Sequence, residues 1–197
     1  MNGHALHPLL ARAAAEAARI ARGVRPGQLD GPTPCTDFDT RTLVNHWVLY
    51  TSHGLEHRAL REELPRELTE RDFTAEAAWA EAYAAQLDRA VAAWADPAVW
   101  VGDVDLMGTP VPATGVARML LKELVVHGWD VARATGQQVE VADDLAEAVL
   151  AVVEDYAELY RRYDGFAEPV TVPATAPAFD RALAASGRDP RWAAVAS

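Results

Sequence analysis

Three side chains that are common metal ligands lie close together in one apolar stretch of the sequence. Glu123 and His127 are four residues apart, and Asp130 follows His127 by three. Residues three and four apart share one face of a helix, so the three side chains are predicted to form one stripe. Most of their neighbours are apolar, and burying a carboxylate among them is costly unless a positive charge meets it. A divalent metal ion would supply that charge, which makes Glu123 and His127 candidate metal ligands.

A further ligand must come from another part of the chain, because zinc sites commonly combine two histidines with one carboxylate and leave one position open. His46 is the best candidate, since it lies one turn from Leu43 and Tyr50 on the apolar side of a predicted helix. A lone histidine on such a face is more often a structural core residue. His53 and His57 form a rival pair four residues apart, although the residues around them are polar.

Asp130 has two readings. A histidine that binds a metal usually donates its other ring N–H to a carboxylate, and Asp130 is close enough to His127 along the helix to accept it. Alternatively, Asp130 caps the helix or forms a salt bridge with Arg133. Other side chains near the two candidate segments are predicted to line a pocket, with no catalytic step assigned to any of them: Trp47, Tyr50, His53 and Arg133.

The composition argues against several classes of function. The 197 residues include 29 acidic and 18 basic ones and carry a formal charge of −11, so a nucleic-acid partner is not expected. The single cysteine, Cys35, excludes an intramolecular disulfide, and no basic neighbour in the sequence marks it as a nucleophile. No stretch approaches the roughly 18 apolar residues of a membrane span, and the first residues lack a signal-peptide pattern. We therefore expect a cytoplasmic protein.

The elements that hold these residues are predicted to be mainly helices. Apolar residues recur at spacings of three and four over five segments, approximately 5–22, 40–62, 74–96, 112–134 and 143–163. Residues 99–112 are predicted to form a short extended excursion, residues 170–173 a short strand, and residues 177–186 a short helix. The absence of regular βα alternation indicates an all-α bundle with minor β content, in a single domain spanning residues 1–197.

Two segments resemble the signatures of a known family. Residues 32–46, PTPCTDFDTRTLVNH, and residues 123–136, ELVVHGWDVARATG, resemble the actinobacterial maleylpyruvate isomerase N-terminal and DinB-like metal-binding proteins. The end of the chain, with VPA at 172–174, DR at 180–181 and GRDP at 187–190, resembles the tail of a short single-domain branch. The resemblance implies a DinB-like four-helix bundle core with a short C-terminal extension, in which His46, Glu123 and His127 hold a metal.

The resemblance also implies a chemistry. Related enzymes use zinc to activate a low-molecular-weight thiol, mycothiol in actinobacteria, for transfer or isomerisation. Zinc held by two neutral imidazoles and one carboxylate keeps one net positive charge, which favours a thiolate or hydroxide as the next ligand. We therefore expect a zinc or other divalent-metal enzyme, a thiol transferase or isomerase-like protein acting on an electrophilic small molecule. The chain is too short for the extra C-terminal domain of full maleylpyruvate isomerase, which argues against that particular isomerisation.

Two other functions fit the same residues. In the first, the metal is a Lewis acid that works without a thiol, in an isomerase, cyclase or hydrolase of a secondary pathway. In the second, the bundle is not an enzyme and binds a metal or a partner, such as a second copy of itself in a homodimer formed through an apolar helix face.

Overall fold

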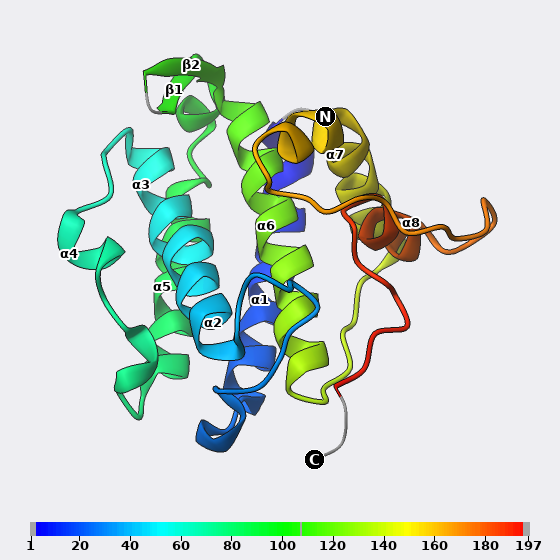
Figure 1. Ribbon diagram of the computed structural model, residues 1–197. Helices are drawn as coiled ribbons and strands as arrows, with labels where there is room; N and C mark the ends of the chain where they lie inside the picture. The colour runs from blue at the N-terminus through cyan, green and yellow to red at the C-terminus, as the bar shows by residue number, and fades with distance from the viewer. Residues whose placement is uncertain (1–2, 107, 195–197) are drawn as a thin grey trace.

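The computed structural model describes residues 3–106 and 108–194, which fold mainly into helices (Figure 1). The long helices are α1 (Gly3–Gly23), α5 (Trp79–Ala93), α6 (Ala113–Ala134) and α7 (Asp143–Arg162). The shorter ones are α2 (Thr40–Val48), α3 (Gly54–Leu60), α4 (Arg66–Thr69) and α8 (Ala178–Ala185). Single turns of other helix types are η1 (Pro26–Gln28), η2 (Leu49–His53), η3 (Phe73–Ala75) and η4 (Pro97–Trp100). The predicted mainly helical fold is therefore confirmed.

Helix α6 lies at the centre of the bundle (Figure 1). It packs against α1, α2 and α7, while α5 packs against α1 and α3. The buried face of α1 follows the predicted helical spacing, with Leu6, Leu10 and Ile20 almost completely buried. Burying each such side chain contributes about 1.5–3 kcal/mol, so these interfaces fix the position of α6 against its neighbours. Helix α8 packs against α7, and the chain that follows α8 returns to α6 through the contact of Arg188 with Asp130.

The segment predicted as one helix over residues 40–62 is helical but not uniform. The Asp39 side chain accepts a hydrogen bond from the Thr42 backbone N–H and begins α2, and a π-helical turn, η2, then joins α2 to α3. The wider turn shifts the helix faces, so His53 stacks on Phe73, with ring centroids 5.4 Å apart. Helix α3 ends at Leu60, two residues earlier than predicted, because the next residue adopts left-handed backbone angles.

The remaining differences lie at the edges of the bundle. The third predicted helix begins at Trp79 rather than near residue 74, because a 3-10 turn capped by the Asp72 side chain comes first. The predicted extended excursion is an antiparallel hairpin of β1 (Asp103–Leu106) and β2 (Thr109–Pro112), with Val104 opposite Val111. The strand predicted over residues 170–173 was wrong: Val170 instead donates its backbone N–H to the Ala184 carbonyl of α8. None of the helices in residues 3–106 and 108–194 is long and apolar enough to cross a membrane.

Candidate metal centre

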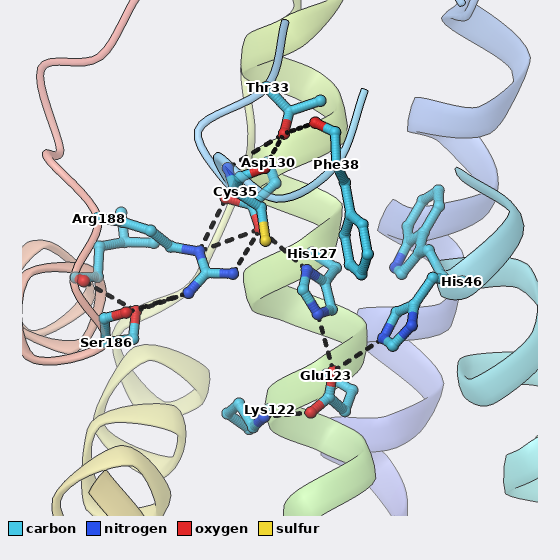
Figure 2. A network of polar contacts seen from close by, with 12 residues as sticks. Thr33, Cys35, Phe38, His46, Lys122, Glu123, His127, Asp130, Ser186 and Arg188 are labelled. Carbon is cyan, nitrogen blue, oxygen red and sulfur yellow. Dashed lines mark hydrogen bonds and ion pairs between the residues drawn. The ribbon is translucent and has the colours of Figure 1, made fainter. Parts of the chain in front are cut away.

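Glu123 and His127 lie on one face of α6, and His46 approaches them from α2 (Figure 2). One carboxylate oxygen of Glu123, Oε2, lies 2.9 Å from Nε2 of His127 and 3.8 Å from Nε2 of His46. The two imidazole rings are 5.0 Å apart and nearly perpendicular. The structure therefore brings together three side chains from two helices, and each presents one possible metal-ligating atom to the same small space.

The spacing of these three atoms fits a metal ion. Zinc–nitrogen and zinc–oxygen bonds of 2.0–2.2 Å in a tetrahedral arrangement place neighbouring ligand atoms about 3.3–3.6 Å apart. The two separations measured from Glu123 Oε2, 2.9 and 3.8 Å, lie on either side of that range. All three ligand atoms lie within 4.8 Å of one another, which makes them candidate ligands of one ion.

The hydrogen bonding of His127 points to a cation between it and Glu123. Nδ1 of His127 lies 2.9 Å from Oδ2 of Asp130, and an ionised carboxylate only accepts, so Nδ1 carries the proton. In a neutral ring, Nε2 is then an acceptor that faces another acceptor, the carboxylate of Glu123. Either a proton or a metal ion must lie between these two atoms. Burial lowers the pKa of His127, but the Glu123 charge and the hydrogen bond to Asp130 raise it above its ordinary value.

Lys122 is a buried cation next to this site, and its position along the sequence gives little sign of that role. Its side chain is 3% exposed, its ammonium group donates to Glu123 Oε1, and it lies 4.0 Å from the ring centre of Tyr160. Burial favours the neutral form of Glu123, yet the Lys122 and His127 charges hold its pKa well below the ordinary value. Burial also lowers the pKa of Lys122, against the opposing charge of Glu123. The charges around Glu123 therefore favour its ionised form, which is the form that can bind a metal.

Asp130 contacts a second buried cation, Arg188, from the chain beyond α8 (Figure 2). Nε of Arg188 lies 2.8 Å from Oδ1, and its Nη2 lies 2.8 Å from Oδ2. Burial alone would raise the pKa of Asp130, but the Arg188 charge and the hydrogen bonds from His127 and Arg188 lower it. Of the two readings of Asp130, the structure contains the contact with His127, whereas Arg133 donates to the Trp192 backbone carbonyl.

Cys35 also lies at the edge of the site. Its sulfur, a ring nitrogen of His127 and a carboxylate oxygen of Asp130 all lie within 4.8 Å of one another. This second group is a poorer cation site, because Arg188 already occupies both oxygens of Asp130. Burial raises the pKa of the Cys35 thiol to about 11, with Arg188 opposing that shift. The sequence shows no basic residue next to Cys35. The fold brings Arg188 close to it, but burial raises the thiol pKa more than the Arg188 charge lowers it.

The four side chains predicted to line a pocket have different surroundings. The Tyr50 ring lies 4.7 Å from the His46 ring and is 40% exposed. Trp47 is fully buried and donates its ring N–H to the Leu124 carbonyl, so it belongs to the core rather than to an accessible pocket. His53 lines a separate cavity of about 150 Å³ between η2 and α5. Arg133 holds the C-terminal segment through Trp192.

Comparison with known proteins places the chain in a family. A family profile described as the mycothiol maleylpyruvate isomerase N-terminal domain matches residues 10–132, a region that contains His46, Glu123, His127 and Asp130. Two uncharacterised proteins of Mycobacterium tuberculosis, one from each of two strains, are each 30% identical over 190 residues. Those alignments cover 94% of this chain and the full length of each relative. No solved structure matches the chain.

Proposed function

The chain belongs to the mycothiol maleylpyruvate isomerase N-terminal domain family, and we propose that it is a metal-dependent enzyme that brings a thiol to an electrophilic small molecule. His46, Glu123 and His127 hold the metal in this proposal. The observation that carries it is the convergence of three possible ligand atoms from two helices: Oε2 of Glu123 lies 2.9 Å from Nε2 of His127 and 3.8 Å from Nε2 of His46. The family description, which names mycothiol, supports a low-molecular-weight thiol as the co-substrate.

The buried charges around the three ligands support an anionic co-substrate. Lys122 pairs with Glu123, and Arg188 pairs with Asp130, so these four charges cancel when His127 is in the neutral form that binds a metal. A divalent metal, which we propose to be zinc, would leave the centre positive and lower the pKa of a thiol or water bound to it. Thiolates are soft anions that zinc binds well, which favours the thiol over an uncharged ligand.

The surroundings of His46 indicate how a substrate reaches the site. The side chain of His46 is 29% exposed, whereas those of Glu123 and His127 are 17% and 11% exposed. The rings of Phe38 and Tyr50 flank His46, with centroids 5.3 and 4.7 Å away. In this proposal the substrate enters beside these rings, which supply an apolar contact surface and displace water from the reacting groups.

Titration of the purified protein with Co²⁺ tests the metal centre. We expect one equivalent to bind and to give the intense visible spectrum of a four- or five-coordinate ion. Three variants, His46→Ala, Glu123→Gln and His127→Ala, should each weaken binding by about 100-fold or more. The matched control is His53→Ala, which removes a half-buried histidine from the other cavity and should leave binding unchanged. Equal binding by His127→Ala and the wild type would refute the proposal.

A second titration tests the use of a thiol. Addition of mycothiol or 2-mercaptoethanol to the Co²⁺ protein should produce a sulfur-to-cobalt charge-transfer band in the near ultraviolet. An unchanged spectrum would contradict the thiol. If the protein also consumed an electrophilic substrate without any thiol, the alternative of a Lewis-acid enzyme would replace it.

A further inference from the structure

The sequence GRDP at residues 187–190 forms the turn that follows α8 and returns the chain toward α6. Gly187 has a φ of +84°, and a Cβ added there would lie 2.7 Å from the Cβ of Ala167. A residue with a side chain would be strained in this conformation, whereas glycine adopts it readily. The turn directs the next side chain, Arg188, inward, where only 6% of it remains exposed.

Hydrogen bonds to two parts of the chain hold the Arg188 guanidinium in this position. Its Nη1 donates to the backbone carbonyl of Ser186 at 3.2 Å, while Nε and Nη2 hold the two carboxylate oxygens of Asp130. The Asp130 side chain is fully buried, so the contact is shielded from water and from salt. A planar guanidinium that contacts both oxygens fixes the plane of the carboxylate, which a single point charge does not.

We infer that Arg188 is a positioning residue of the metal centre, which acts on His127 through Asp130. The fixed carboxylate directs Oδ2 at Nδ1 of His127, so the ring keeps its proton on Nδ1 and presents Nε2 to Glu123. The residue lies outside the region that the family profile matches, residues 10–132. The C-terminal segment therefore completes the centre as well as covering α7. The part of this inference that concerns metal affinity rests on the proposed function.

A purely structural role would predict something different. A buried ion pair that only supports the tail would lower the stability of the protein without changing a folded His127. Direct repulsion between Arg188 and a metal ion would make the metal bind more tightly once the arginine was removed. The positioning role predicts weaker binding and an altered His127 ring.

Two substitutions of Arg188 test the inference, with one matched control. Arg188→Met removes the charge, and Arg188→Lys keeps it but cannot contact both oxygens in one plane. The control is Arg191→Met in the same segment, where the arginine is 85% exposed and pairs with Asp189. The first measurement needs no metal: proton NMR of the metal-free protein should show a slowly exchanging imidazole N–H assigned to Nδ1 of His127. The second measurement is the dissociation constant for Co²⁺.

We expect the His127 N–H signal to vanish in Arg188→Met and to persist in Arg191→Met. Binding of Co²⁺ should weaken about 10- to 100-fold in Arg188→Met, less in Arg188→Lys, and by no more than about 2-fold in the control. In an Asp130→Asn background, the further change to Arg188→Met should have almost no effect on binding, because the arginine acts through the carboxylate.

An unchanged signal in a folded Arg188→Met protein, or unchanged or tighter Co²⁺ binding, would overturn the inference. Should Arg188→Met not fold, wild-type behaviour of Arg188→Lys in both measurements would overturn it equally. A wild-type protein that bound no Co²⁺ would refute the proposed function instead, and the NMR signal alone would then decide the role of Arg188.

Discussion

Replacement of Lys122 by methionine should destabilise the metal-free protein and strengthen metal binding. The substitution keeps an unbranched side chain of similar length but removes a cation that is 3% exposed. That cation contacts Glu123 and lies 4.0 and 5.1 Å from the ring centres of Tyr160 and Phe166. Without it, the remaining ion-pair partners of Glu123 among the described residues are His127 and His46. Lys122 and a metal ion compete for the charge of Glu123, so the variant should gain more stability from metal than the wild type does.

The size of the effect follows from the burial of the pair. Removing one partner of a buried ion pair costs about 3–5 kcal/mol, and contacts of the methionine sulfur with the two rings return about 0.3–1.5 kcal/mol. The net loss in the free energy of unfolding is therefore about 1.5–4.7 kcal/mol. In a domain of this size, 1 kcal/mol shifts the melting temperature by about 2–4 °C, so the metal-free variant should melt about 3–19 °C lower. A metal concentration 1,000 times its dissociation constant adds about 4 kcal/mol.

Urea denaturation with a chelator, and again with excess Co²⁺, measures both quantities. The control is Arg118→Met on the same helix, where the arginine pairs with the exposed Asp155 and should contribute less than about 1 kcal/mol. The reasoning fails if Lys122→Met costs no more than the control in the metal-free protein. It fails as well if the loss is equally large with Co²⁺ bound, because Lys122 would then stabilise the fold without acting through Glu123.

Two shorter predictions concern residues near the site. Burial raises the pKa of Cys35 to about 11, so iodoacetamide should alkylate it about 300-fold more slowly at pH 7.5 than a free thiol of pKa about 8.5. The alkylation rate should rise about tenfold per pH unit up to pH 10. A rate like that of glutathione would contradict the buried thiol. Gly187→Ala should lower the free energy of unfolding more than Gly136→Ala does. Gly136 has a similar φ of +72° but nothing within 4 Å of an added Cβ, so its substitution should cost about 1–2 kcal/mol. Equal losses in urea denaturation would refute crowding by Ala167.

Local patterns in the sequence predicted the fold well, and the differences arise where tertiary contacts decide. Apolar spacing located the long helices because each buries one face against a neighbour. It did not predict the π-helical turn η2, where Thr51 and Ser52 donate their hydroxyl protons to the backbone carbonyls one turn earlier. The β-branched residues Val170, Thr171 and Val172 predicted a strand at residues 170–173, because such residues favour extended backbone whether or not a partner strand exists. The backbone N–H of Val170 instead donates to the Ala184 carbonyl of α8.

The residues of the candidate site also differ in whether the local sequence pattern predicts them. Glu123, His127 and Asp130 were recognisable because helical spacing alone places them on one face, and His46 because a further ligand was needed. Spacing offers no comparable signal for Arg188, which reaches Asp130 across 58 residues of chain. Lys122 has no sequence signal for another reason: a lysine beside a glutamate usually lies in solvent, whereas here its ammonium group lies against the rings of Tyr160 and Phe166. A buried carboxylate implies a cation. Glu123 and Asp130 each have one from the protein, so charge balance alone does not require a metal, and the support for the proposed metal is the convergence of His46, Glu123 and His127.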